Sequence, residues 1–95
     1  MAEPEPTEVS FTGFIISLAH TAAVHFGDLP EPGADQPGEP NLPAAHQIID
    51  ILTLLELKTR GNLTAEERQV LEQLLYELRM RYVSLRDDTP RIIQP

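Results

Sequence analysis

The sequence of 95 residues contains no cysteine and no tryptophan, and its first 43 residues contain no lysine or arginine. Without cysteine the chain forms no disulfide, has no thiol nucleophile and cannot bind zinc through thiolates. Fifteen acidic side chains against seven basic ones give a net charge of −8. Because its first half has no cation at all, we expect the protein to bind neither nucleic acid nor an anionic membrane surface.

The acidic charge is concentrated in the segments that are richest in proline. Residues 1–9 carry three acids and two prolines, and we expect a disordered acidic tail. Residues 28–43 carry five prolines, two glycines and four acids, a composition typical of an exposed loop rather than a helix or central strand. Residues 87–95, interrupted by Pro90, are predicted to be a second, flexible tail. Residues 10–86 are therefore expected to form one helical domain.

The first residues lack the basic start and apolar core of a secretory signal, so we expect a cytoplasmic protein. The stretch from Val9 to Gly27 is uncharged and approaches the ~20 residues needed to span a bilayer. Its serines, threonines and histidines, and the absence of basic flanks, argue against a membrane span. Peripheral membrane attachment through this stretch is kept as an alternative.

Three segments have the apolar spacing of amphipathic helices, at about residues 10–26, 44–60 and 64–86. The predicted fold class is therefore all-α. So few residues separate the second and third segments that we expect an antiparallel αα-hairpin. The proline-rich loop joins the first helix to this hairpin, and leaves open whether that helix packs on its own hairpin or on that of another chain.

Each predicted helix has residues suited to its ends. Ser10 is a candidate N-cap of the first helix, and Gly27 can adopt the left-handed conformation that ends it. Pro43 is suited to the first turn of the second helix, where its missing N–H costs nothing. Thr64 and Glu67 form the S/T-x-x-E pattern of a capping box at the start of the third.

One apolar stripe on each helix predicts the hydrophobic core. The stripes also pass through Ala22, Phe26 and Ala45. The candidate core residues are Phe11, Phe14, Ile15, Leu18, Ile48, Ile49, Leu52, Leu55, Leu71, Leu74, Leu75, Leu78 and Tyr82.

A second apolar set lies on the opposite faces of the helices, where a three-helix monomer should be polar. Exposed patches of this kind usually mark interfaces, although single exposed apolar side chains are common and need no explanation. We therefore expect a protein–protein interaction or assembly module whose partner is a second copy of the chain, another protein, or both. The candidate interface residues are Ile16, His20, Ala23, Val24, Tyr76, Met80 and Val83.

No sequence motif of a known catalytic or nucleotide-binding site is present, and we expect no cofactor, no metal and no enzymatic activity. His46 and Asp50 are four residues apart and would be neighbours on a helix, so a small metal-dependent or acid–base enzyme is the alternative. Arginines gather around the end of the third helix. They could complement the helix dipole, pair with the acidic first half, or meet an anionic partner.

Several short segments resemble a family of small bacterial proteins, domain of unknown function 1844. The resemblance covers about residues 10–83 and implies a small all-helical protein with no assigned activity and no catalytic residues to transfer. Its most specific parts are GNLT and LYELRMRY. The segments that carry it are FTGF (11–14), SLA (17–19), FGD (26–28), NL (41–42), IDIL (49–52), KTRGNLT (58–64) and LLYELRMRY (74–82).

Overall fold

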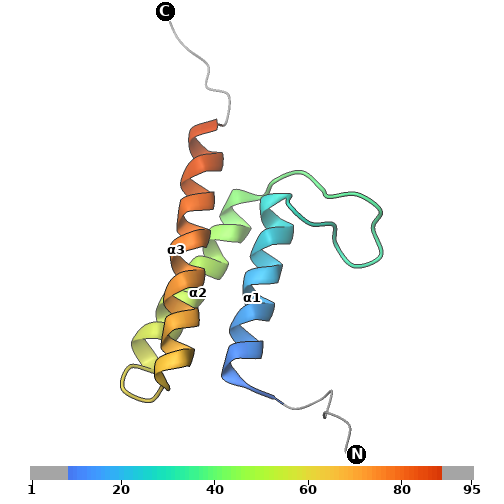
Figure 1. Cartoon of the computed structure of the whole chain (residues 1–95). Helices are drawn as coiled ribbons and strands as arrows, with labels where there is room; N and C mark the ends of the chain where they lie inside the picture. Colours follow the sequence, from blue (N-terminus) through green and yellow to red (C-terminus); the bar gives the residue numbers. More distant parts are fainter. Residues whose placement is uncertain (1–8, 89–95) are drawn as a thin grey trace, which may run out of the picture.

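The computed structural model describes residues 9–88, and this part of the chain contains three helices and no strand. The helices are α1 (Phe11–Phe26), α2 (Leu42–Lys58) and α3 (Ala65–Asp88) (Figure 1). The predicted all-α fold class is confirmed. Most of the tail predicted at 1–9 and of the tail predicted at 87–95 lies outside the described residues.

The helix ends differ from the predicted ones by up to two residues. α2 begins at Leu42 rather than Ala44 because Asn41 is its N-cap, so the exposed loop ends at Asn41 rather than Pro43. α3 continues through Asp87 to Asp88, which the sequence pattern placed in the flexible tail. No glycine or proline interrupts this stretch before Pro90, and a proline disfavours helix only from the residue immediately before it.

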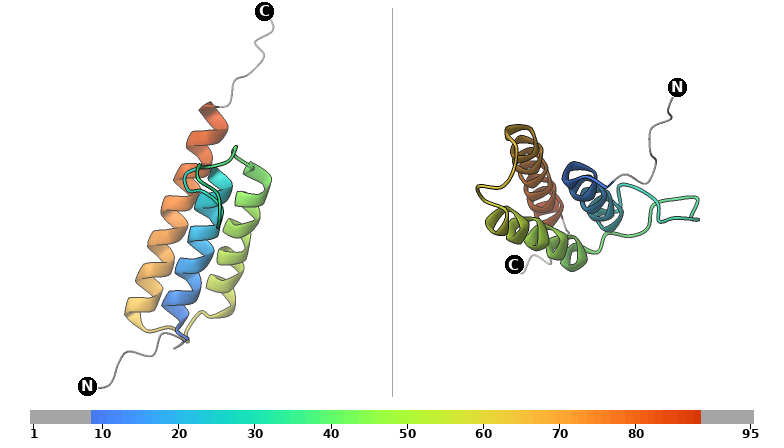
Figure 2. Two further views of the ribbon diagram at one scale, coloured as in Figure 1. Left: turned by 90° about the vertical axis from the view of Figure 1, so that its right-hand side faces the viewer. Right: turned by 90° about the horizontal axis from the view of Figure 1, so that it is seen from below.

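The three helices form an up-down-up arrangement in which every helix contacts the other two. α2 and α3 run in opposite directions as a hairpin, and α1 runs alongside α3 in the same direction (Figure 1). Seen end-on, the helices occupy the corners of a triangle, and the loop after α1 projects away from them (Figure 2). Helix α1 therefore packs on the hairpin of its own chain in this structure.

All three helices are capped at their start: the predicted Ser10 cap and Thr64–Glu67 capping box are present, and Asn41 caps α2. The Ser10 hydroxyl accepts a hydrogen bond from the Gly13 N–H at 2.9 Å, and the Asn41 side-chain oxygen accepts one from the Ala44 N–H at 3.1 Å. In the capping box the Glu67 N–H donates to the Thr64 hydroxyl at 3.0 Å. The Thr64 N–H in turn donates to the Glu67 carboxylate at 2.8 Å. These bonds satisfy backbone donors that no helical carbonyl can reach.

The core lies along the central axis of the triangle and is built from all three helices. Phe11, Leu18, Leu55, Leu74 and Tyr82 are only partly buried and pack around its margin. The buried residues are Ile15, Ala22, Phe26, Ala45, Ile48, Ile49, Leu52, Leu71, Leu75 and Leu78.

Phe14 was wrongly predicted as a core residue, since 47% of its surface is exposed. It follows Phe11 by three residues but lies about 100° around the helix from Ile15, at the edge of the stripe. Ile15, Ala22 and Phe26 occupy the centre of the buried face instead. The small side chain of Ala22, which is completely buried, lets the neighbouring helices approach α1 closely.

The proline-rich loop is fixed to the helices at both of its ends. The Asp28 N–H donates to the Ala23 carbonyl at 2.9 Å, and the Asn41 N–H donates to the His25 carbonyl at 2.6 Å. Gly27 has a φ of 82°, and a Cβ at this position would lie 3.0 Å from the Gly38 carbonyl oxygen. The two ends of the loop therefore pack closely together at the end of α1, and Gly27 is needed both for its conformation and for the space it leaves.

Candidate interaction surface

Three large apolar side chains form a line on the outer face of α3. Tyr76 is 62% exposed, Met80 52% and Val83 37%, and their spacing of four and three residues places them on one side of the helix. The opposite side of the same helix supplies Leu71, Leu75 and Leu78 to the core. We call Tyr76, Met80 and Val83 the α3 stripe.

The α3 stripe borders a shallow groove between α2 and α3 with a volume of about 320 Å³. Leu75, Tyr76 and Met80 give the groove its apolar surface, and two acids and one base surround it. Its lining residues are Glu56, Glu72, Leu75, Tyr76, Arg79 and Met80. The stripe and the groove together make a continuous surface that is apolar in the middle and charged at its margin, an arrangement typical of interfaces.

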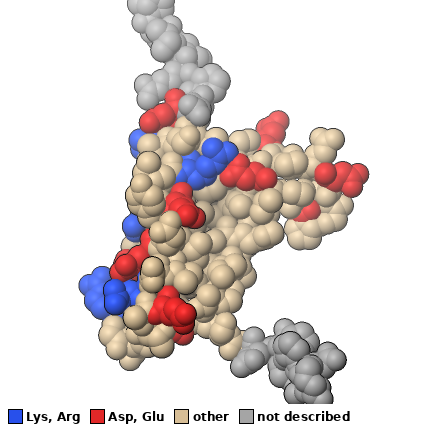
Figure 3. Space-filling model, viewed as in Figure 1, with Lys and Arg blue, Asp and Glu red and all other residues tan. Residues whose placement is uncertain are grey.

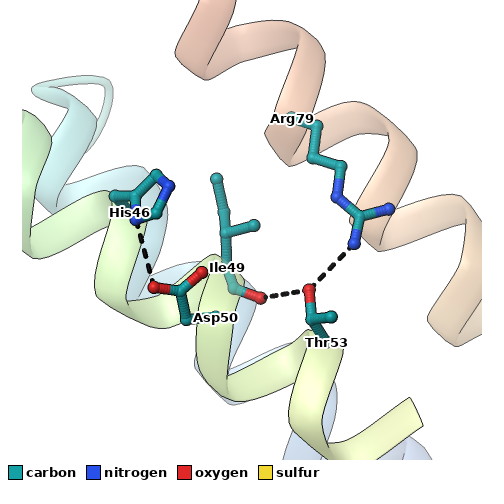
Figure 4. A network of polar contacts seen from close by, with 5 residues as sticks. All are labelled: His46, Ile49, Asp50, Thr53 and Arg79. Carbon is teal, nitrogen blue, oxygen red and sulfur yellow. Dashed lines mark hydrogen bonds and ion pairs between the residues drawn. The ribbon is translucent and has the colours of Figure 1, made fainter. Parts of the chain in front are cut away.

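Arg79 is held at the margin of this groove by a short polar network (Figure 4). Its guanidinium donates to the Thr53 hydroxyl at 2.8 Å, and that hydroxyl donates to the Ile49 carbonyl at 2.8 Å. Because the Thr53 hydroxyl is directed by the backbone of α2, it presents a fixed acceptor to α3. The network sets the position of a positive charge beside the α3 stripe.

His46 and Asp50 contact each other on the exposed side of α2 (Figure 4). The His46 Nδ1 lies 3.2 Å from an Asp50 carboxylate oxygen. The His46 ring also packs against Tyr82 of α3, with 5.1 Å between the ring centroids. A carboxylate in this position fixes the orientation of the imidazole ring. Among residues 9–88, no three His, Asp or Glu side chains are grouped so that they could hold a metal ion.

The candidate interface residues on α1 are not equally exposed. Ile16 and His20 are exposed, whereas Ala23 and Val24 are half-buried. None of these four residues lines the groove beside the α3 stripe. The structure therefore does not bring the α1 set and the α3 set together into one site at this groove.

The arginines of α3 have separate partners. Arg81 forms two hydrogen bonds to the Asp28 carboxylate at the end of α1. Glu77 accepts a hydrogen bond from the Gln73 amide at 2.7 Å. Arg86 lies 3.4 Å from Asp87, and Arg91 lies outside the described residues. One arginine of the cluster thus pairs with the acidic first half of the chain, one of the roles that the sequence suggested.

Sequence reasoning missed the margin of the groove. No sequence pattern marked Glu56 or Glu72 as part of a site, because single exposed acids on a helix are common. Arg79 stood out only as one of several arginines near the end of the third helix. Whether Glu56 of α2 and Glu72 of α3 line the same groove depends on the relative rotation in which the two helices pack. The same applies to a second pocket of about 260 Å³ at the α2–α3 turn, lined by Glu56, Thr59, Arg60, Gly61, Leu63, Arg68, Leu71 and Glu72.

Charged side chains are unevenly spread over the molecule. In the view of Figure 3 they gather over α3 and around the loop that follows α1. The surface of α1 between them is free of charge, since α1 contains no Asp, Glu, Lys or Arg. None of the helices in residues 9–88 has both the length and the apolar character required to cross a membrane.

The fold and these surfaces can be set against known proteins. No curated protein and no solved structure was found to match the chain. The model of the family described as "Domain of unknown function (DUF1844)" matches residues 8–84, which include all three helices except the end of α3. This confirms the resemblance found in the sequence. The chain belongs to the DUF1844 family.

Proposed function

We propose that this protein is a helical protein–protein interaction module, and that it assembles with a second copy of itself through the α3 stripe. The proposal rests on the exposure of Tyr76, Met80 and Val83 along one line of a helix whose other side is already buried in the core. A helix that is apolar on two faces needs a second partner to cover the outer one.

The energetic case follows from the type of residue. Fully burying a large apolar side chain contributes about 1.5–3 kcal/mol, and anchors of this size dominate the binding energy of most interfaces. Tyr76 adds a hydroxyl group that can stay at the edge of a contact while its ring is buried. In a two-fold symmetric pair each anchor is used twice, so three residues supply six buried side chains.

The assembly is tested by measuring its mass with light scattering at micromolar concentration. We expect a dimer for the native protein and a monomer for Met80→Asp, with the helical content unchanged because Met80 lies outside the core. Leu54→Asp is the matched control: it makes the same kind of change at a residue of α2 with nearly the same exposure, 53% against 52%. A Met80→Asp protein of unchanged mass would refute the assignment of this surface.

Helix α1 offers a second contact surface, made by the exposed residues Ile16 and His20. It suits an apolar partner because the whole helix is uncharged (Figure 3). Ile16→Asp separates this surface from the α3 stripe: if α1 is used in the same dimer, this change also lowers the mass. Leu18→Asp is expected to disturb folding as well, because Leu18 packs against the core.

The alternative function is acid–base chemistry or metal binding at His46 and Asp50, and it rests on the 3.2 Å contact between them. Metal analysis of protein purified without a histidine tag distinguishes the two proposals. Zinc, iron or manganese bound in stoichiometric amount, and lost in His46→Ala, would favour the alternative. Metal-free protein that still dimerises through Met80 would favour the interaction module.

A further inference from the structure

We infer that α3 of one copy pairs with α3 of the second copy in the antiparallel direction, with the two-fold axis at the level of Leu78. This inference rests on the proposed function, because it takes the α3 stripe as the contact surface. It adds the direction and register of the pairing, which the stripe alone leaves undetermined.

The first observation is the spacing of exposed residues along α3. The stripe continues in both directions with alternating steps of three and four residues, the seven-residue repeat by which two helices pack along a common seam. Only its three central members are apolar; glutamines precede them and an aspartate follows. All seam residues are exposed: Gln69, Gln73, Tyr76, Met80, Val83 and Asp87.

The second observation is the charge of the residues beside this seam. Glu72, Arg79 and Arg86 precede Gln73, Met80 and Asp87 on one side, and Glu77 and Ser84 follow Tyr76 and Val83 on the other. In a parallel pair, Glu72 of each copy would face Glu77 of the other, and both contacts would repel. In an antiparallel pair whose axis is level with Leu78, Glu72 of each copy faces Arg86 of the other, and both contacts attract. Of the two directions, only the antiparallel one therefore gives an attractive contact between these flanking charges.

The apolar residues then select the register. With the axis level with Leu78, Tyr76 packs on Met80 of the second copy and Val83 packs on Gln73 of the second copy. The central contacts join a thioether to an aromatic ring, which is a favourable pair. Sliding the helices by one repeat sets Tyr76 against Asp87 in one direction and Val83 against Glu66 in the other. The chosen register covers all three apolar side chains and leaves Asp87 beside Gln69.

This register also places like charges near the axis, where the two Glu77 residues approach each other on one side and the two Arg79 residues on the other. Each is already held within its own chain. The Gln73 amide donates to Glu77 at 2.7 Å, and Arg79 donates to Thr53 of α2 at 2.8 Å. These bonds hold the Glu77 carboxylate along α3 and direct the Arg79 guanidinium toward α2.

Charge exchange tests the direction. The dimer dissociation constant is measured by analytical ultracentrifugation for Glu72→Arg, Arg86→Glu and the double variant. In the antiparallel pair each single change turns two attractions into two repulsions and weakens the dimer about three- to tenfold, and the double variant restores the native value. In a parallel pair Glu72→Arg tightens the dimer instead, because the new arginine faces Glu77. Tighter binding, or no restoration in the double variant, overturns the inference.

The absence of cysteine allows a second, geometric test with a single introduced spin label. In the antiparallel pair, labels on Ser84→Cys are separated by about 18 Å along the helix axes and labels on Glu77→Cys by about 3 Å. In a parallel pair the two variants give the same separation. If the Ser84→Cys and Glu77→Cys labels give equal distances while Met80→Asp still dissociates the dimer, the antiparallel pairing is overturned. The proposed contact surface is then retained. A monomeric native protein overturns the proposed function as well.

Discussion

Arg81 and Asp28 form a bidentate ion pair, although the two residues are 53 positions apart in the chain. The Arg81 Nε donates to one carboxylate oxygen at 2.9 Å and an Nη donates to the other at 2.5 Å. Asp28 directly follows the glycine that ends α1, and Arg81 lies in α3. The pair therefore joins the start of the proline-rich loop to α3. It fixes the end of α1 on α3, whereas the loop itself connects α1 to α2.

A double-mutant cycle with Asp28→Asn and Arg81→Gln should give a coupling energy of about 0.5–1 kcal/mol in urea unfolding. The value is small because both side chains are more than one-third exposed and water screens their attraction. The control is the Arg68–Glu72 pair, whose atoms are 3.8 Å apart and whose side chains are more exposed. Equal coupling energies for the two pairs would contradict a special role for Arg81 and Asp28.

Leu52→Ala should lower the free energy of unfolding by about 2–5 kcal/mol, because Leu52 is completely buried and its loss leaves a cavity between all three helices. Leu54→Ala makes the same chemical change two residues away in α2, at a largely exposed side chain, and should cost less than about 0.5 kcal/mol. Thermal or urea unfolding of the two variants measures the difference. Comparable losses would show that Leu54 is buried in the protein in solution.

Gly27→Ala should destabilise the protein more than Gly61→Ala, although both glycines have a φ near 85° and each substitution strains the backbone. The difference arises because a Cβ on Gly27 meets the Gly38 carbonyl oxygen at 3.0 Å, whereas a Cβ on Gly61 meets nothing within 4 Å. We expect about 1 kcal/mol for Gly61→Ala and a larger loss for Gly27→Ala. Hydrogen exchange should show the additional loss at the Asn41 amide, which bonds to the end of α1. Identical stabilities would indicate that the loop moves aside at no cost.

Glu67→Ala should cost about 0.5–1 kcal/mol more than Glu66→Ala in the free energy of unfolding. Both acids lie in the first turn of α3, where a carboxylate interacts favourably with the helix dipole. Only Glu67 also accepts a hydrogen bond from the Thr64 N–H, at 2.8 Å. Glu67→Gln should retain most of the stability, since its amide oxygen can accept the same bond. A Gln variant as unstable as the Ala variant would assign the effect to charge instead.

Much of the candidate site could be predicted from spacing alone. Tyr76, Met80 and Val83 are four and three residues apart, and that interval places them on one face of any straight helix. Their exposure could also be predicted, because the regularly spaced leucines on the opposite face of the helix were expected to form the core. The groove beside them could not be predicted, because it needs Glu56 of α2 next to Glu72 of α3. That neighbourhood depends on the rotation and offset of two packed helices, which no local pattern contains.

The existence of the three helices, the N-terminal caps of α1 and α3, and the loop between α1 and α2 could be predicted from the sequence alone. These features depend on contacts within about four residues: a Ser10 or Thr64 side chain bonding to the next turn, and a glycine or proline that ends a helix. The DUF1844 family could also be recognised from the sequence, through short segments such as GNLT and LYELRMRY.

Packing of the three helices against one another determines which part of each apolar stripe is covered. A stripe of about 120° on α1 includes both Phe14 and Phe26, yet the two neighbouring helices bury Phe26 and leave Phe14 half exposed. It also decided that Arg81 reaches Asp28, because the two residues meet only when α1 lies alongside α3. The physical reason is the same in both cases. Packing among three helices fixes their rotations together, and a single helix carries no information about the rotation of the others.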